Sequence, residues 1–370
     1  MKYCKKCVQP DTRPGAIFCD DGICFVCKYS ESKNKIDWKE RKKQLEDIAK
    51  WAKKNNKTNY DCVVGVSGGK DSLFQALYVK EELGLNVLLV NCVPEKITDV
   101  GKKNLENLTQ KGFDIFMIRP NPKIMKQLIK KSFYKYGNPI KPSEYPLYAV
   151  AYQVALAQDI PLIIEGENPG ITFGATEGVG MDGNALNINL WNTLAGCNAD
   201  DWIGDGIERK ELSLYQFPDK NTLNKHSIKA LYLNYYVREW GYSYNTEFAI
   251  KHGLMGRPNH NSNETGRLNP YCAVDSDFQI VNQLLKFIKF GFGYVTDEVC
   301  YWIREGKMSR NEGIELVKKY DGKCADKYVM QFCDYINISI NEFWHVANSF
   351  RGLMWRKDSK KVWSLKDSIY

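Results

Sequence analysis

Long apolar stretches are missing from this chain of 370 residues. No uninterrupted apolar run reaches the length of about 20 residues that a transmembrane helix needs. The N-terminal residues 1–7 are basic, but the apolar segment of a signal peptide does not follow them. We therefore expect a cytoplasmic protein without a membrane partner.

Histidine is scarce, and the net charge is modest. The four histidines show no metal-ligand spacing, so we expect them to be structural or surface residues. The 52 basic and 44 acidic residues give a net charge of +8, which permits an anionic ligand without requiring one. A nucleic-acid partner is not expected.

The most informative motif that is present is Ser67-Gly68-Gly69-Lys70-Asp71-Ser72. The apolar run 62–66 before it predicts a buried strand, and the apolar spacing of residues 73–79 predicts a helix after it. Glycines let the backbone approach a bound group closely, and a helix N-terminus offers free N–H groups and a positive dipole end. The motif therefore predicts an anion site. It is not a Walker A loop, because that pattern needs Ser or Thr directly after the lysine.

The segment 65–72 resembles the PP-loop of the ATP pyrophosphatase superfamily, and we use that name for it. Those enzymes cleave ATP between the α- and β-phosphates and use the adenylyl group to activate a carbonyl or carboxylate oxygen. The alternative is a glycine turn that merely connects a strand to a helix. Six matching residues in a strand–turn–helix context favour the PP-loop. The expected ATP-binding residues are Ser67, Gly68, Gly69, Lys70, Asp71 and Ser72.

Two Cys-x-x-Cys pairs stand near the N-terminus, Cys4 with Cys7 and Cys24 with Cys27. Their spacing is typical of a zinc ribbon, in which four thiolates surround one ion and leave no open position. A disulfide pair or an iron–sulfur cluster is the alternative. The ligand spacing and a reducing compartment favour structural Zn²⁺. Cys19 lacks a partner at this spacing, and we expect it to take no part.

Beyond the ribbon, expected strands alternate with expected helices, which predicts an α/β fold with a doubly wound parallel sheet. Residues 171–217 are rich in Gly, Asn and Asp, and we expect a long functional loop there. The expected strands are 61–66, 86–93, 113–118, 160–165 and 230–237; the expected helices are one amphipathic helix within 30–59, then 71–83, 101–111, 123–136, 145–158, 246–252, 280–290, 296–305, 309–319 and 340–350.

We divide the chain into three expected parts. Residues 1–30 form the zinc ribbon, residues 31–245 the PP-loop ATP-binding domain with its long loop, and residues 246–370 a mostly helical C-terminal region. Ligands of doubly wound sheets bind beyond the carboxyl ends of the strands. The segments 67–72, 91–93 and 165–168 all follow expected strands, so we expect them to face one crevice.

Taken together, these motifs resemble those of the N-acetyl sugar amidotransferases (the PseA/WbpG type). The resemblance rests on residues 4–15 and 21–27 of the ribbon, on the PP-loop, on 165–168, and on the C-terminal segments 285–293 and 311–323. It spans most of the chain. The ribbon and the PP-loop are shared with other PP-loop enzymes, whereas the two C-terminal segments are discriminating.

The resemblance implies an ATP-dependent conversion of an acetamido group on a nucleotide-activated N-acetyl sugar to an acetamidino group, in the biosynthesis of surface or flagellin glycans such as pseudaminic acid. Adenylation would make the amide oxygen part of AMP, so that ammonia adds at carbon and expels AMP. Asp71 would hold Mg²⁺, and Glu167 would be a second ligand or a base. Glu165 is the alternative candidate for the role of Glu167, and we also expect it among the ATP-binding residues. Lys70 would be solvated or contact phosphate.

The nitrogen source is expected to be a separate glutaminase. A built-in glutaminase needs a nucleophilic cysteine, but Cys4 is explained as a zinc ligand, and Cys197 and Cys272 lie in irregular segments. A tRNA thiolase of the same superfamily is the alternative function, although no Cys-x-x-Cys pair follows Cys27. A non-catalytic nucleotide sensor, with the ribbon as a docking module, is a third hypothesis.

Overall fold

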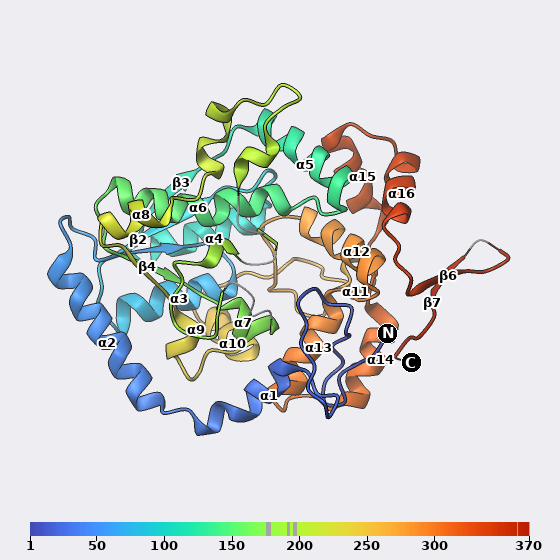
Figure 1. The fold of residues 1–370 in the computed structure, drawn as a ribbon, viewed down its shortest axis with the longest axis horizontal. Helices are drawn as coiled ribbons and strands as arrows, with labels where there is room; N and C mark the ends of the chain where they lie inside the picture. The colour runs from blue at the N-terminus through green and yellow to red at the C-terminus, as the bar shows by residue number, and fades with distance from the viewer. Residues whose placement is uncertain (175–178, 191–192, 195–197, 361, 370) are drawn as a thin grey trace.

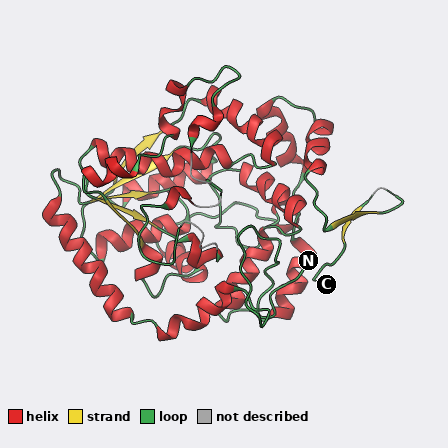
Figure 2. Cartoon of the chain, viewed as in Figure 1, coloured by secondary structure: helices red, strands yellow, loops and turns green. Residues whose placement is uncertain are grey.

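A five-stranded parallel sheet is the centre of the α/β part of the molecule (Figures 1 and 2). The structure is a computed structural model that describes residues 1–174, 179–190, 193–194, 198–360 and 362–369. The strand order is β3-β2-β1-β4-β5, and every neighbouring pair is parallel, which confirms the predicted doubly wound sheet. The strands are β1 (Cys62–Gly65), β2 (Val87–Cys92), β3 (Asp114–Ile118), β4 (Leu162–Glu165) and β5 (Lys229–Tyr232).

The order of the strands places the switch point of the sheet between β1 and β4. The chain adds β2 and β3 on one side of β1, and β4 and β5 on the other. Connections after β1 and β4 therefore leave in opposite directions and open a crevice at the carboxyl edge. The PP-loop follows β1 and residues 166–168 follow β4, so both predicted segments stand at this edge.

Helices cover both faces of the sheet, because β1, β2 and β4 are buried Val-, Leu- and Ile-rich runs that need partners on each side, whereas the edge strand β3 is largely exposed. Residues of α2, α3, α4 and α10 form one core, and residues of α6 and α8 form the other. The helices of this part are α2 (Trp38–Asn55), α3 (Lys70–Glu81), α4 (Asp99–Gln110), α5 (Pro122–Tyr136), α6 (Lys141–Ala157), α7 (Pro169–Phe173), α8 (Lys220–Lys225), α9 (Leu233–Tyr236), α10 (Tyr242–Lys251) and α11 (Ser262–Thr265).

Two predictions for the middle of the chain need correction. The predicted strand 230–237 ends at Tyr232, and α9 follows it, because only Lys229–Tyr232 finds a neighbour in β4. Within the described part of 171–217, the expected loop contains short helices rather than irregular chain. They are the end of α7, and the 3₁₀ helices η2 (Ile188–Leu190), η3 (Ala199–Trp202) and η4 (Arg209–Tyr215).

The C-terminal region is a helical layer beside the sheet (Figure 1). Its core joins this layer to α5, where Phe133 contacts Phe332 and Phe343. The sequence did not predict α15 or the terminal hairpin. The elements are α12 (Phe278–Phe290), α13 (Tyr294–Arg304), α14 (Arg310–Tyr320), α15 (Asp326–Ile336), α16 (Ile340–Ser349), β6 (Trp355–Lys357) and antiparallel β7 (Trp363–Leu365).

The N-terminal cysteine segment packs on the C-terminal layer rather than on the sheet that follows it in sequence. Its Val8 and Val26 share a core with Val295 and Val299 of α13 and Val317 of α14. The chain then continues through α1 (Phe25–Ser32) and η1 (Lys33–Lys35) to α2. Within the described residues, no helix combines the length and apolarity needed to cross a membrane.

Candidate active site

The PP-loop forms a tight turn that leaves the N-terminus of α3 open. Gly68 has φ +77°, and a Cβ there would lie 3.3 Å from side-chain atoms of α4, so the turn requires glycine. Gly69 is the N-cap of α3, and no described side chain caps it. The Ser72 hydroxyl donates to the Gly69 carbonyl (3.1 Å), while Ser67 Oγ accepts from the Gly69 N–H (3.3 Å). Backbone N–H groups of the first turn thus stand ready for an anion.

Lys70 and Asp71 form a nearly buried ion pair at this helix end. Lys70 Nζ lies 2.6 Å from both Asp71 carboxylate oxygens and 4.6 Å from the centre of the Tyr242 ring. Asn245 Nδ2, on α10, donates to Asp71 Oδ1 (2.7 Å) and fixes its orientation. Burial alone would lower the pKa of Lys70, but Asp71 outweighs burial and raises that pKa. The interpretation of Lys70 as a solvated side chain is therefore wrong, because only 5 % of it is exposed.

The two carboxylates after β4 lie in different surroundings. Glu167 faces the same cavity as Asp71, and burial, together with the charge of Asp71, raises its pKa to about 7. Asn168 holds the turn, since its Oδ1 accepts from Gly170 N (2.7 Å) and its own N–H donates to Asn234 Oδ1 (3.0 Å). Burial raises the pKa of Glu165 to about 7 as well, but among the described residues Glu165 is not part of the cavity wall.

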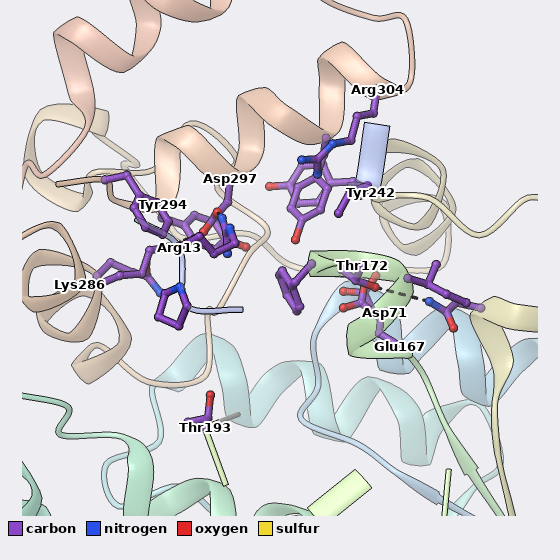
Figure 3. A pocket seen from close by; sticks show the side chains of 18 of the residues that line it. Arg13, Asp71, Glu167, Thr172, Thr193, Tyr242, Lys286, Tyr294, Asp297 and Arg304 are labelled. Atoms are coloured by element: carbon purple, nitrogen blue, oxygen red, sulfur yellow. Dashed lines mark hydrogen bonds and ion pairs between the residues drawn. The ribbon is translucent and has the colours of Figure 1, made fainter. Parts of the chain in front are cut away.

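A cavity of about 470 Å³ extends from Asp71 and Glu167 to the C-terminal layer (Figure 3). This volume is in the range of small-molecule sites. The α/β part, the cysteine segment and the C-terminal helices each supply part of its wall. Lining residues from these three sources are Lys70, Asp71 and Glu167; Arg13, Pro14 and Val26; and Gln283, Lys286, Asp297 and Tyr301.

The wall opposite Asp71 and Glu167 carries two cations that share one carboxylate (Figure 3). Arg13 Nη2 pairs with Asp297 Oδ1, and Lys286 Nζ pairs with Asp297 Oδ2. Both cations also lie over the Phe292 ring, at 4.7 Å for Arg13 and 4.6 Å for Lys286. Burial alone would raise the pKa of Asp297, but Arg13 and Lys286 hold it below its ordinary value. We call Arg13, Lys286 and Asp297 the cation wall.

Glu144, on α6, is a further carboxyl that faces the cavity. Its Oε2 is covered, and no described group donates a hydrogen bond to it. Burial raises the pKa of Glu144 to about 8, although nearby Lys141 opposes the shift. At neutral pH the Glu144 carboxyl is therefore mostly protonated.

The four predicted cysteine ligands come together at the end of the same layer. The Sγ atoms of Cys4, Cys7, Cys24 and Cys27 are buried and lie within 4.8 Å of one another. Cys4 and Cys27 are 4.0 Å apart and Cys7 and Cys24 3.7 Å, close to the edge of about 3.8 Å that a tetrahedron with zinc–sulfur bonds of about 2.3 Å would have. The arrangement fits a structural Zn²⁺.

Neighbouring groups stabilise these sulfurs and connect them to the cavity. Backbone N–H groups of Lys6 and Cys24 donate to Cys4 Sγ at 3.4 and 3.2 Å. Arg304, which lines the cavity, has Nη2 3.5 Å from Cys7 Sγ and 2.8 Å from Gln9 Oε1. Arg304 therefore contacts the four-cysteine cluster and also lines the cavity.

Several site residues escaped the sequence analysis. Arg13 and Lys286 stand inside segments that carry the family resemblance, so that resemblance was the available signal. Asn245 and Tyr242 have no local motif, and only the packing of α10 against α3 brings Asn245 to Asp71 and Tyr242 to Lys70. Cys197 lies outside the described residues. Cys272 is buried beside the Tyr242 hydroxyl (3.1 Å), and burial raises its pKa to about 11, which does not favour a nucleophilic thiolate.

Comparison with known families supports one part of this assembly directly. Residues 265–369 match the family model described as LPS biosynthesis protein WbpG-like, C-terminal domain. The region that carries α12 to α16 is therefore similar to the C-terminal domain of WbpG-like proteins, which confirms the resemblance predicted from segments 285–293 and 311–323.

The other comparisons add little. A comparison with curated protein sequences gives no match. Among solved structures, the NH3-dependent NAD synthetase from Campylobacter jejuni subsp. jejuni NCTC 11168, in complex with the nitrate ion, matches 61% of this chain and 100% of its own chain at 15% identity. The TM-score is 0.31, and no conclusion is drawn from that likeness.

Proposed function

We propose that this chain is an ATP-dependent amidotransferase that converts the acetamido group of a nucleotide-activated N-acetyl sugar to an acetamidino group, through an adenylated intermediate and ammonia. The observation that carries the proposal is the shared cavity. One end has a PP-loop and two carboxylates, and the other is built by a WbpG-like C-terminal domain. A glycan-biosynthesis domain thus faces an anion site of the kind that binds nucleotide phosphates.

ATP would bind with its phosphates at the open N-terminus of α3. The free N–H groups there and the Ser67 and Ser72 hydroxyls suit phosphate oxygens. Lys70 would leave Asp71 and contact phosphate, because its ammonium is already held within reach of the loop. Asn245 would hold the Asp71 carboxylate in place after Lys70 has moved.

The carboxylates fit Mg²⁺, which is usually bound through one or two carboxylates together with phosphates. Asp71 and Glu167 face one cavity and are close enough for the charge of Asp71 to raise the pKa of Glu167. When bound, Mg²⁺ would neutralise charge that develops on the phosphates. If Asp71 is bound to the metal, Glu167 is the carboxylate of this pair that remains to accept a proton from the attacking ammonia.

Ammonia would come from a separate glutaminase. The only described free cysteine close to the PP-loop carboxylates, Cys272, is a buried neutral thiol, so it does not suit glutamine hydrolysis. We expect the purified chain to use ammonium salts and not glutamine, and a partner glutaminase to restore glutamine use. Glutamate release by this chain alone would contradict this part of the proposal.

The tRNA thiolase alternative is less favoured. Such enzymes need additional cysteines near the ATP site, whereas the described cysteines close to this cavity are Cys272, whose buried thiol is neutral, and the buried four-cysteine group with its neighbour Cys300. The WbpG-like C-terminal domain also points to glycan biosynthesis rather than to RNA.

The deciding experiment incubates the zinc-loaded chain with Mg²⁺, ATP, an ammonium salt and single members of a panel of nucleotide-activated N-acetyl sugars. We expect AMP and pyrophosphate with at least one sugar, and a product whose mass is lower by one unit, as replacement of O by NH requires. ADP and phosphate as products, or AMP release that depends on tRNA, would contradict the proposal.

A further inference from the structure

The cation wall has more positive charge than its carboxylate neutralises. Arg13 and Lys286 each contribute one positive charge, and Asp297 is the carboxylate that both of them contact. Asp321 is close enough to Lys286 to act on its pKa, but it does not line the cavity, and its carboxylate accepts from Gly293 N (2.7 Å) and from the Thr296 hydroxyl (2.7 Å). The part of the cation wall that lines the cavity therefore has two cations and one carboxylate.

Arg13 also has an unused donor. Its Nη2 binds Asp297, yet its Nε is buried and has no acceptor among the described residues. A buried donor without a partner is costly, and arginine can bind phosphate through two donors at once. The side chain itself is only 12 % exposed, and its Cζ lies over the rings of Phe292 (4.7 Å) and Phe173 (5.7 Å). The unpaired Nε therefore gives this cavity-lining guanidinium a further donor for an anion.

The surroundings of the cation wall suit a phosphate group rather than a metal or an apolar ligand. Lys289, one helical turn from Lys286 on α12, adds a third cation to the cavity lining, and Gln283 adds an uncharged donor. In Figure 3, Arg13, Lys286 and Asp297 lie across the cavity from Asp71 and Glu167. An anion on this wall is therefore distinct from one at the N-terminus of α3.

We propose that Arg13 and Lys286 bind the phosphate of the nucleotide-activated sugar, so that the cysteine-bound N-terminal segment forms part of the substrate site. This inference rests on the proposed function for the identity of the ligand. A sugar nucleotide held by its phosphate on the cation wall would extend its acetamido group toward the adenylyl group at the PP-loop. The four-cysteine cluster would then act on substrate affinity through Arg13.

A pyrophosphate titration tests the subsite without knowledge of the sugar. The zinc-loaded full chain is first saturated with Mg²⁺ and α,β-methylene ATP, which occupies the PP-loop, and inorganic pyrophosphate is then titrated by calorimetry. The wild type should bind pyrophosphate at this second site, and Arg13→Gln and Lys286→Gln should each weaken it at least about tenfold. Arg13→Lys, which keeps a cation beside Asp297 but lacks the second donor, should recover only part of the affinity.

Arg310→Gln is the matched control. Arg310 Nε donates to the carbonyl of Cys7 (3.1 Å) and so holds the same segment from α14, but it does not line the cavity. Its loss should change pyrophosphate affinity by less than about twofold while it lowers thermal stability. The proposal is overturned if the wild type shows no second pyrophosphate site, if Arg13→Gln binds like the wild type, or if Arg310→Gln weakens binding as much as Arg13→Gln.

The nucleotide sugar separates this proposal from the proposed function. With any sugar that supports AMP release, Arg13→Gln should raise KM for the sugar about tenfold and leave KM for ATP nearly unchanged. A kcat loss at unchanged sugar KM would contradict the subsite. If no nucleotide sugar supports AMP release, the proposed function fails, while the pyrophosphate titration still decides whether Arg13 and Lys286 form an anion site.

Discussion

The two walls of the cavity differ in charge and in origin. The wall at the sheet edge brings together Asp71, in the first turn of α3 after β1, and Glu167, in the turn after the neighbouring strand β4. The cation wall instead joins Arg13 near the N-terminus to Lys286 and Asp297 in the C-terminal domain. The carboxylates at the sheet edge suit a metal ion and the chemical step, whereas the cations opposite suit recognition of a substrate phosphate.

This difference shows how a common α/β fold can acquire its own substrate. The sheet edge depends only on strand order and a short motif, and it can serve many reactions. The cation wall depends on two parts added to this fold, the N-terminal cysteine segment and the C-terminal helical layer. They share a core of Val8, Val26, Val295, Val299 and Val317. Changes at the sheet edge should therefore alter turnover, and changes at the added parts should alter stability and substrate affinity.

The largest effect should come from the loss of a cysteine ligand. Cys24→Ser removes one of four thiolates, and structural zinc in small domains contributes about 10–16 kcal/mol of binding free energy. We expect zinc, measured by elemental analysis, to fall from one per chain to nearly none, with a marked drop in melting temperature.

Cys19→Ser is the control for this change. Cys19 lies in the same segment but outside the described four-cysteine group, so it should keep full zinc and stability. Equal zinc content in Cys24→Ser and the wild type, or equal zinc losses in Cys24→Ser and Cys19→Ser, would contradict a zinc site at the four cysteines.

A smaller but still large effect is expected at the sheet edge. Asp71→Asn keeps the shape of the side chain but removes the charge that would hold Mg²⁺, and loss of one such electrostatic contact typically lowers kcat about 10²–10³-fold. AMP release should fall by that factor with zinc content unchanged, and the melting temperature should fall as well, because the buried Lys70 ammonium loses the charge of its partner. Asp99→Asn, at the exposed first turn of α4, should retain normal turnover. An Asp71→Asn protein with the wild-type rate would contradict the assignment of the chemical step to the sheet edge.

The smallest effect concerns Glu144, which belongs to neither wall. Its pKa, raised to about 8 by burial, lies above the ordinary carboxyl value, so the folded state favours the protonated form. That contribution to stability is complete below the unfolded pKa and is lost as pH rises through about 8. Because Glu144 keeps some exposure, we expect the wild type to lose about 1–2 kcal/mol relative to Glu144→Gln between pH 5 and pH 9.

Chemical denaturation of both proteins at a series of pH values measures this difference. Glu106→Gln, at an exposed position of α4, is the control and should follow the wild type at every pH. A gap between wild type and Glu144→Gln that stays constant from pH 5 to pH 9 would show that Glu144 ionises freely.

Local patterns were sufficient for the sheet and for the PP-loop. Buried Val- and Leu-rich runs and a glycine turn before a helix are short-range signals, and the structure has β1, α3 and their neighbours close to the predicted bounds. The prediction of a strand over 230–237 was wrong at its end, because Leu233–Tyr236 has the apolar and aromatic composition that is typical of a strand. Only the end of pairing with β4 decides where β5 stops.

The cation wall could not be predicted in the same way. Arg13 and Lys286 meet only because the cysteine segment packs on α13 and α14, far along the chain. Asn245 likewise reaches Asp71 through the packing of α10 on α3. Sequence patterns report which side chains carry suitable chemistry, but the positions of these three residues depend on tertiary contacts that no local spacing encodes.

The most direct test of the central claim follows one oxygen atom. A nucleotide-activated N-acetyl sugar with oxygen-18 in its acetamide is converted with ATP, Mg²⁺ and an ammonium salt, and the products are analysed by mass spectrometry. If the sheet edge adenylates the substrate that the cation wall holds, AMP will carry the label and the amidino sugar will have lost it. Label in inorganic phosphate, or label that stays in the sugar while AMP is formed, would contradict the account.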